Sequence, residues 1–343
     1  MTTTRSNKSR PNARVSMQSI ADLVGVSRTT VSFVLNGKEK EGRISPVVAK
    51  KIKEVARREN YRFNELARSL RTGYTRTIAL VVADISDRFF ASLAFHVQQQ
   101  ALHKGYLVVI ASVGEDKAQF LPTVEMLIDR RVDGMIIVPI QHTEQEIARL
   151  IETGFPIVLA DRYFPDLKTD RVIIDNFGAS FQIVSLLLEK GCRRIAMLLY
   201  DDQLMHMQER QKGYEKALGK YPNAAQPIIR KIGYATSQKE VDKAIRELFH
   251  DNTTCNIDGL FFATGGLAMF GIETLIQLGI PIGKQVQIAC FDRADFVPNL
   301  RIPYVHQPIR KMSETAVDML LTRIEKGDQP DESKILEPRV ILR

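Results

Sequence analysis

Two patterns of hydrophobic and polar positions follow each other along the chain. Up to about residue 60, hydrophobic residues recur every three or four positions, which is the spacing of one buried face on an α-helix. From residue 77 onward, short hydrophobic runs alternate with longer stretches of helical spacing, as is typical of strands that alternate with helices. The pattern therefore predicts a small helical unit followed by a larger α/β unit.

Three helices are predicted in the first unit, each with a recognisable beginning. Ser16, Ser27 and Ser45 can cap helices that start at the following residue, because a serine hydroxyl accepts a hydrogen bond from a free helical N–H. Gly25 ends the first helix and Asn36 the second. The hydrophobic positions expected in the core of this unit are Ile20, Leu23, Val24, Val31, Val34, Leu35, Val48, Ile52, Val55 and Ala56. Two capped helices joined by a short glycine-containing turn form the helix-turn-helix motif.

Positive charge is concentrated in this part of the chain. Residues 1–76 contain 17 Lys and Arg against 6 Asp and Glu, whereas the remaining residues contain 31 against 34. A basic head on a nearly neutral body indicates a module that binds a polyanion. Arg28, Thr29 and Thr30 begin the second helix of the motif, from which side chains reach base edges in the major groove of DNA. The free N–H groups at the starts of the first two helices suit phosphates. We therefore expect this unit to bind double-stranded DNA.

At this point the sequence resembles the LacI/GalR family of bacterial transcription regulators. The matching segments read SMQSIA from residue 16, GVSRTTVS from residue 25, VLNG from residue 34, NY from residue 60 and NELARSL from residue 64, and the likeness continues through the rest of the chain. The resemblance implies DNA contacts from Ser16, Ser27, Arg28, Thr29, Thr30, Ser32, Asn36, Arg43, Tyr61, Asn64, Ala67 and Leu70.

The resemblance also implies that residues 64–71 form a hinge helix, which folds when two chains meet on DNA. So short a helix is unstable in isolation. Leu70 matches the family's leucine wedge, which enters the minor groove and kinks the operator. Two departures from the family pattern stand out: Phe63 replaces a frequent proline, and residues 38–43 lengthen the loop before the third helix, which carries Arg43.

The second unit contains at least nine hydrophobic runs that predict strands. They are Thr77–Val82, Leu107–Ala111, Gly134–Pro139, Ile157–Ala160, Val172–Ile174, Ile195–Leu199, Ile228–Ile232, Gly259–Ala263 and Val286–Phe291. Their alternation with helical stretches predicts doubly wound parallel sheets covered by helices, in two lobes rather than one. A single large α/β domain or a barrel is the alternative. The family resemblance implies two Rossmann-like lobes of the periplasmic-binding-protein type, with three crossovers between them.

The expected organisation has four parts. Residues 1–14 form a basic tail, 15–62 the helix-turn-helix domain, 63–76 the hinge and linker, and 77–343 the core that binds an effector and dimerises. Within the core we expect one lobe over about 77–175 and 305–328, and the other over about 176–304 and 329–343.

Polar and aromatic residues follow the predicted strands, where ligands of open parallel sheets bind. These residues are Asp84, Asp87, Phe89, Phe90, Asp161, Arg162, Asp175, Asn176, Thr264, Asp292 and Arg293. Carboxylates that accept hydroxyl hydrogens, together with rings that cover C–H faces, suit a polyhydroxylated ligand such as a sugar. By resemblance, Arg210 and Asp292 contact the effector directly. The expected effector-binding set is Asp87, Phe90, Asp161, Asn176, Arg210, Thr264 and Asp292. Thr264-Gly265-Gly266 replaces the family's usual Asn-Asp pair, and Arg88 a common proline.

Other chemistries lack a sequence signal. There is no phosphate-cradling Gly-Lys-Ser/Thr loop and no nucleophile elbow. The six histidines and three cysteines have no metal-ligand spacing, so we expect neither an enzyme nor a cofactor or metal. His206 and the other histidines are expected at the surface or in packing. Neither a membrane-spanning run nor a secretory leader is present, so we expect a cytoplasmic, nucleoid-associated protein and no membrane partner.

The sequence thus favours a homodimeric transcriptional regulator, a repressor by preference, whose operator affinity is set by a small effector, with a sugar as the first choice. A nucleobase or a protein corepressor in place of the sugar, or a derivative of a solute-binding protein, are the alternatives. A transport protein would carry a leader and no basic head, and a sugar-processing enzyme would need a catalytic constellation.

Overall fold

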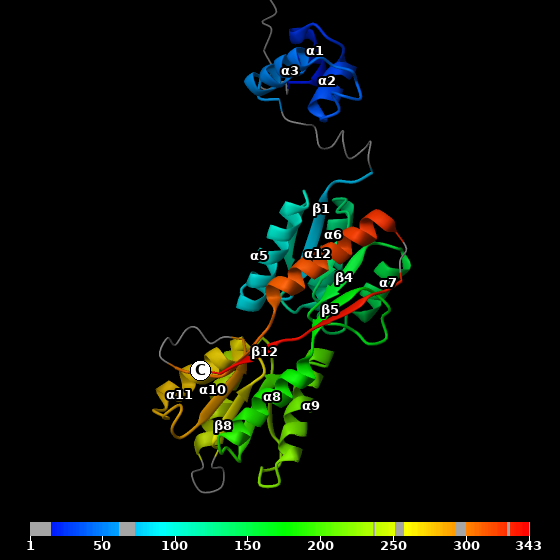
Figure 1. Ribbon diagram of the computed structural model, residues 1–343. Coiled ribbons are helices and arrows are strands. Elements are labelled where there is room, and N and C mark those ends of the chain that lie inside the picture. The colour runs from blue at the N-terminus through cyan, green and yellow to red at the C-terminus, as the bar shows by residue number, and fades with distance from the viewer. Residues whose placement is uncertain are drawn as a thin grey trace, which may run out of the picture. The chain divides into compact units, whose positions relative to one another are not determined.

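The computed structural model describes residues 15–61, 73–235, 237–250, 257–292, 300–327 and 330–342. The chain forms two compact units, residues 1–73, here called the head, and residues 74–343, here called the core (Figure 1). The predicted hinge positions Asn64, Ala67 and Leu70 lie outside the described residues.

The head contains the three predicted helices, α1 (Met17–Val24), α2 (Arg28–Leu35) and α3 (Pro46–Arg58). All three serine caps are present, and Gly25 ends α1 at a φ of 80°, a left-handed conformation that glycine adopts without strain. The hydrophobic interior of the head contains Ile20, Val31, Val34 and Ile52, each at most 1% exposed, together with Ala21, Ala49, Val55 and Ala56.

One residue predicted in the hydrophobic interior of the head, Leu23, does not lie there. The Leu23 side chain is 53% exposed, although its spacing after Ile20 places it near the hydrophobic face. The buried stripe of α1 runs through Met17, Ile20, Ala21 and Val24, and Leu23 lies beside it.

The core consists of two lobes, each built on a six-stranded sheet. The N-lobe sheet has the order β11-β5-β4-β3-β1-β2 and the C-lobe sheet the order β12-β10-β9-β8-β6-β7. Among the described residues, the neighbouring strands of both sheets are parallel except β12 against β10. The N-lobe strands are β1 (Thr77–Val82), β2 (Leu107–Ser112), β3 (Met135–Ile137), β4 (Ile157–Ala160), β5 (Arg171–Ile174) and β11 (Ser333–Leu336). The C-lobe strands are β6 (Ile195–Tyr200), β7 (Ile228–Ile232), β8 (Gly259–Phe262), β9 (Gln287–Phe291), β10 (Tyr304–His306) and β12 (Arg339–Ile341).

Helices cover the sheets, as the alternating pattern predicts. The N-lobe carries α5 (Arg88–His103), α6 (Lys117–Asp129), α7 (Glu144–Glu152) and α12 (Ile309–Lys326). The C-lobe carries α8 (Asn176–Glu189), α9 (Met205–Lys220), α10 (Ser237–His250) and α11 (Gly265–Gln277). Figure 1 shows the two helix sets at opposite ends of the core. The open sheets exclude the barrel alternative.

The chain passes between the lobes three times, after β5, after β10 and after β11, which confirms the predicted number of crossovers. The predicted lobe bounds are wrong in two places. β10 pairs with β9 in the C-lobe, and β11 pairs with β5 in the N-lobe. These strands are short, and Ser333–Leu336 is mostly exposed, so neither gives a strong hydrophobic run.

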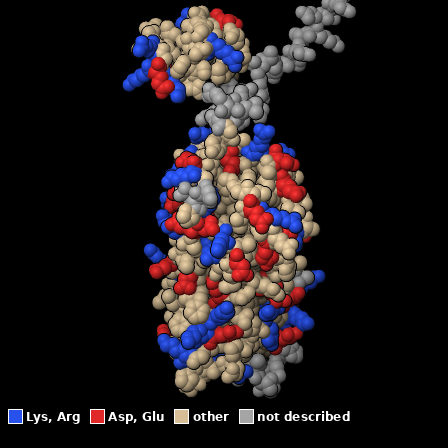
Figure 2. All heavy atoms as spheres, turned by 90° about the vertical axis from the view of Figure 1, so that its right-hand side faces the viewer, with Lys and Arg blue, Asp and Glu red and all other residues tan. Residues whose placement is uncertain are grey.

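The core carries nearly equal numbers of acidic and basic residues, and both kinds are found over its surface. On the face turned to the viewer in Figure 2, acidic and basic side chains of the core are interspersed. Among the described helices, none combines the length and hydrophobicity that crossing a bilayer requires.

Candidate functional site

The start of α2 presents two of the predicted DNA contacts to solvent. Arg28 and Thr29 are exposed, and Ser27 caps the helix by accepting a hydrogen bond from the backbone N–H of Thr30 at 3.0 Å. The Thr30 side chain is half-buried, and its hydroxyl lies 2.8 Å from that of Ser27. Arg28 and Thr29 are therefore better placed than Thr30 to reach a base edge.

The other described DNA-contact candidates differ in how far their side chains are already engaged. Asn36 donates from Nδ2 to the backbone oxygen of Ser32 at 2.6 Å, so this side chain helps to end α2. The half-buried Tyr61 packs against the hydrophobic interior of the head. Burial raises the pKa of its phenol, and the charge of nearby Arg28 opposes that shift. Exposed Ser16 forms a capping box with Ser19 at the start of α1.

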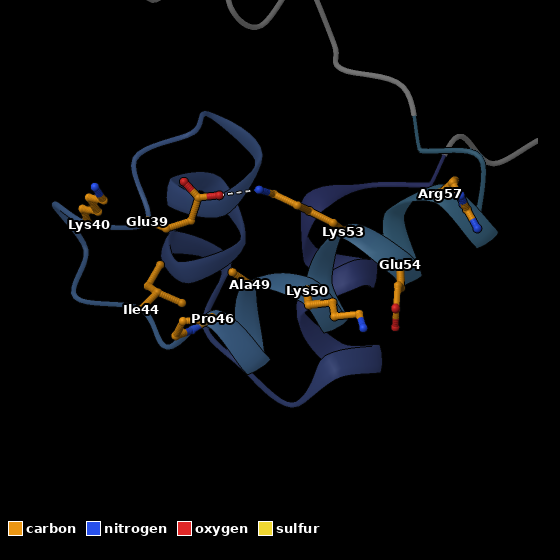
Figure 3. Close-up of a pocket in the computed structure, with 9 residues that line it drawn as sticks. All are labelled: Glu39, Lys40, Ile44, Pro46, Ala49, Lys50, Lys53, Glu54 and Arg57. Atoms are coloured by element: carbon orange, nitrogen blue, oxygen red, sulfur yellow. Dashed lines mark hydrogen bonds and ion pairs between the residues drawn. The ribbon is translucent and has the colours of Figure 1, made fainter.

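The lengthened loop between α2 and α3 is folded against α3. The Glu39 carboxylate pairs with Lys53 Nζ at 2.5 Å (Figure 3), and the exposed Arg43 takes a positive φ of 50°. A hollow of about 590 Å³ lies beside this pair. Figure 3 shows the residues that line it, which are Ile44, Pro46, Ala49 and several charged side chains. The charged ends of its lysine and glutamate side chains stay hydrated at the surface, so a small molecule in this hollow would gain little from hydrogen bonds or ion pairs with them.

The core has a cavity of about 480 Å³ between its lobes. The N-lobe contributes the residues that follow β1 and β4. The C-lobe contributes the ends of β6 and β10 and the residues that follow β6, β7, β8, β9 and β10. Of the seven predicted effector-binding residues, six line this cavity: Asp87, Phe90, Asp161, Arg210, Thr264 and Asp292. The strand-end rule therefore located the cleft correctly.

Asp161 and Asp292 occupy equivalent places in the two lobes. Asp161 follows β4 and Asp292 follows β9, the third strand in each sheet order, and their φ angles are 64° and 62°. Aspartate tolerates this left-handed conformation better than most residues with a side chain, and it directs both carboxyls from the strand ends to the same cavity.

Arg210 lies on the C-lobe wall of the cavity and is only 3% exposed. Its Nε donates to Asn176 Oδ1 at 2.8 Å and its Nη1 to the backbone oxygen of Ala263 at 2.7 Å, while the guanidinium stacks on the Phe291 ring at 3.7 Å. Burial lowers the pKa of Arg210, and the carboxylates of Asp161 and Asp292 oppose this shift. The side chain is thus fixed in place before any ligand arrives.

Asn176 differs from its prediction. It does not belong to the cavity lining; it is 1% exposed at the start of α8, where it accepts the Arg210 hydrogen bond and donates to Glu209 at 3.4 Å. Glu209 in turn accepts a hydrogen bond from the Tyr163 hydroxyl of the N-lobe at 2.9 Å. Asn176 therefore positions Arg210 and connects it to the opposite lobe.

Arg162 is the buried cation of the N-lobe wall. Its Nη1 pairs with Glu115 Oε1 at 2.6 Å, its Nε lies 3.8 Å from Asp161 Oδ2, and the group lies over the Phe90 ring at 5.3 Å. Burial lowers the pKa of Arg162, but the charges of Glu115 and Asp161 outweigh this and raise it.

Burial raises the pKa of the carboxyls in the cleft. Asp292 accepts two hydrogen bonds of 3.1 Å from Gln307 Nε2, yet burial raises its pKa to about 7, against the opposing charge of Arg210. Burial likewise raises the pKa of Asp202 to about 6 and raises the pKa of Asp87 and Asp161.

Two tyrosines outside the predicted set line the cavity, and one of them, Tyr234, links the lobes. Tyr234 donates to Asp84 Oδ2 at 3.1 Å, and its ring packs against that of Tyr200 at a centroid distance of 5.1 Å. A Cβ at Gly266 would lie 3.3 Å from the Tyr200 hydroxyl and 3.6 Å from Asp87 Oδ2. The glycine pair that replaces the family's Asn-Asp thus allows the lobes to approach closely.

A signal for both tyrosines is present in the sequence. Tyr200 is the last residue of β6 and Tyr234 follows β7, so the strand-end rule applied to every strand includes both. His206 and Gln307 also line the cavity, and both are at most 3% exposed. His206 was expected only at the surface or in packing; burial lowers its pKa well below the ordinary value, so the imidazole is neutral.

Buried polar atoms without a partner among the described residues gather at this cavity. Four such atoms belong to its lining residues: Asp161 Oδ1, Arg162 Nε, His206 Nδ1 and Gln307 Oε1. Buried polar groups normally have hydrogen-bond partners, so atoms of this kind point to a ligand. The described residues contain no cluster of three or more His, Cys, Asp or Glu that could hold a metal ion.

Both the head and the core are similar to known protein families. Residues 16–64 match the family model of bacterial regulatory proteins, lacI family, and residues 184–343 match a periplasmic binding protein-like domain. The fructose operon regulatory protein of Vibrio cholerae is 29% identical over 92% of this chain and 96% of its own length. The HTH-type transcriptional repressor PurR of Aliivibrio fischeri strain MJ11 is 27% identical over 95% and 97%.

Solved structures show the same fold. The lac repressor dimer bound to operator and an anti-inducer has a TM-score of 0.83 at 18% identity, covering 95% of this chain and 97% of its own. The complex of the regulator CelR with cellobiose has a TM-score of 0.69 at 23% identity, covering 96% and 99%. With a lacI-type head, a periplasmic-binding-protein-like core and full-length relatives that are named transcriptional regulators, this chain belongs to the lacI family of bacterial transcriptional regulators.

Proposed function

We propose that the protein is a homodimeric repressor that binds an operator through its head and responds to a sugar bound in the cleft of its core. The convergence of buried polar side chains from both lobes on one cavity carries the effector part of this proposal. Because both lobes contribute, a ligand that contacts both stabilises one relative orientation of the lobes.

The chemistry of the cavity suits a polyhydroxylated ligand. A hydroxyl group both donates and accepts, and the unpartnered atoms include acceptors (Asp161 Oδ1, Gln307 Oε1) and a donor (Arg162 Nε). The name of the Vibrio cholerae relative, a fructose operon regulatory protein, agrees with a sugar.

DNA recognition is assigned to the start of α2. Arg28 and Thr29 would read base edges, while Ser16, Ser27, Ser32, Asn36, Arg43 and Tyr61 would contact phosphates or the DNA backbone. Asn64, Ala67 and Leu70 would act in the minor groove. Since one reading helix is present per chain, a dimer requires a pseudo-palindrome with half-sites about one helical turn apart.

Exposed hydrophobic side chains at one edge of the N-lobe support a dimer. Phe95 and Leu102, seven residues apart on α5, are 55% and 63% exposed, and the neighbouring edge strand β2 exposes Leu107 by 63% and Ile110 by 40%. Hydrophobic groups gathered on adjacent elements are typical of an interface. A repressor of this kind acts on the bacterial chromosome, so we place it in the cytoplasm at the nucleoid.

A two-part experiment tests the proposal. The full chain is screened by thermal shift against monosaccharides, disaccharides and nucleobases, and operator sequences are selected from random duplexes. We expect a sugar to raise Tm and the selected site to be a pseudo-palindrome whose affinity falls steeply with salt, because several phosphates are neutralised. A shift with nucleobases alone would transfer the site to the alternative ligand, and salt-insensitive binding would contradict the DNA assignment.

A further inference from the structure

Three carboxylates from different elements line the cavity close to one another. Asp87 belongs to the loop before α5, Asp161 follows β4 and Asp292 follows β9. The charge of Asp87 raises the pKa of both other carboxyls, so the three groups repel one another electrostatically. Gathering three acids in a partly dehydrated cleft is unfavourable unless the ligand donates to them.

The two buried guanidinium groups do not offset this negative charge. Arg162 is paired with Glu115, a fourth carboxylate that lies outside the lining. Asp202, a fifth, also acts on Arg162. Arg210 is left to face Asp161 and Asp292 together. The third arginine of the lining, Arg88, is exposed at the start of α5, where water screens its charge.

Acceptor atoms remain available on both sides of the cavity. Asp161 Oδ1 in the N-lobe and Gln307 Oε1 beside Asp292 are buried and have no partner among the described residues. Gln307 already uses its Nε2 to donate to both oxygens of Asp292, so its remaining oxygen can only accept. A ligand that fits here donates hydrogen bonds to both lobes. A phosphate or carboxylate in the same place would bring negative charge against the three acids.

From this charge balance we infer that the effector is an uncharged, hydroxyl-rich sugar, and that the carboxylates of Asp87, Asp161 and Asp292 exclude its phosphorylated and acidic counterparts. The inference rests on the proposed function, because it defines which sugars the cleft accepts. Hydroxyl groups would donate to the carboxylates and accept from Arg162 Nε, which matches the unpartnered atoms.

Matched pairs of sugars test the inference by calorimetric titration of the full chain at pH 8, which lies above the raised pKa of Asp292, so that its carboxylate carries its charge. Each neutral sugar is compared with its anionic counterparts: glucose with glucose 6-phosphate and glucuronate, fructose with fructose 1-phosphate, and ribose with ribose 5-phosphate; cellobiose, mannose, galactose and xylose complete the neutral set. We expect at least one neutral sugar to bind and each anionic counterpart of a binding sugar to bind at least tenfold more weakly. An anionic member that binds as tightly as its neutral counterpart, or more tightly, would overturn the inference.

A charge-removing variant tests the cause. Asp87 caps α5 by accepting from the N–H of Phe89 at 2.7 Å, and asparagine is an equally good N-cap, so Asp87→Asn removes the charge while keeping the helix start. We expect the preference for the neutral sugar to shrink at least threefold. Asp116→Asn is the matched control, because Asp116 caps α6 in the same way through Ala118 but does not belong to the cavity lining. An unchanged preference in Asp87→Asn would overturn the electrostatic basis.

The possible failures are distinguishable. If an anionic sugar is preferred, the inference fails while the proposed sugar-responsive repressor stands. If no sugar of either kind binds and the full chain still binds its selected operator, both the inference and the sugar part of the proposed function fail.

Discussion

Replacing Asn176 by alanine should destabilise the core and weaken effector binding, although Asn176 is not part of the cavity lining. The substitution removes the acceptor of the 2.8 Å hydrogen bond from Arg210 Nε and leaves that donor unpaired in a side chain only 3% exposed. A hydrogen bond to a charged group contributes roughly 1.5–3 kcal/mol, and a buried donor left unpaired adds its desolvation cost. We therefore expect a loss of about 2–3 kcal/mol in the free energy of unfolding.

This loss translates into measurable changes. For a unit of this size it lowers Tm by about 4 to 10 °C in thermal unfolding followed by calorimetry. Arg210 keeps its bond to the Ala263 oxygen and its stacking on Phe291, so the guanidinium should shift rather than leave the cleft. We expect the affinity for the sugar found in the screen to fall about tenfold, which corresponds to about 1.4 kcal/mol.

Two further variants make the result interpretable. Asn176→Asp keeps an acceptor for Arg210 but places a carboxylate against Glu209, so it should recover part of the stability. Asn223→Ala, at an exposed position before β7, should change neither Tm nor affinity. If Asn176→Ala unfolds within 1 °C of the unmodified chain and binds the sugar equally well, the structural role given to Asn176 is refuted.

Three other predictions follow from the described contacts. Arg28→Ala should cost roughly 1–3 kcal/mol on the selected operator and relax base preference at one position, as read from repeated site selection; an unchanged site preference would mean that α2 is oriented differently. Tyr234→Phe removes the hydroxyl that donates to Asp84 across the cleft, so the sugar should dissociate several-fold faster in stopped-flow experiments, and an unaltered off-rate would argue against an inter-lobe link. Because the pKa of Asp292 is raised to about 7 in the folded chain, stability from its bound proton is full below its unfolded pKa and lost as pH rises through about 7, so Tm without sugar should fall between pH 6.5 and 8, and less so in Asp292→Asn. Below pH 6.5, His206 acts in the opposite sense, because its lowered pKa makes the folded chain resist protonation.

The helical head could be predicted almost completely from the sequence. Serine caps and a glycine terminator are local signals that do not depend on the rest of the fold, and all three caps are present in the structure. Leu23 is the exception, because the width of the buried stripe depends on how three helices pack. The nine predicted strands of the core are all found, because seven of them are buried parallel strands with continuous hydrophobic runs, and the edge strands β2 and β7 are also rich in Val and Ile.

The residues of the site that directly follow strands could be predicted from the sequence. Asp161 and Asp292 follow buried strands, and the topology brings them to one cavity. Asn176 also follows a strand, but its side chain bonds to Arg210 from outside the lining, and no local pattern distinguishes a residue facing a cleft from one supporting it. Gln307 follows β10, whose three residues give too short a run to predict a strand.

Coupling between the cleft and operator binding can be measured in one titration. The full chain is titrated into its selected, labelled operator duplex and followed by fluorescence anisotropy, without and with a saturating amount of the sugar that binds the core. We predict a change of at least fivefold in operator Kd on adding the sugar, and no such change for Asp292→Asn, whose sugar-free operator affinity should stay within about threefold of the original. Identical operator affinities with and without a sugar that demonstrably occupies the cleft would contradict the account.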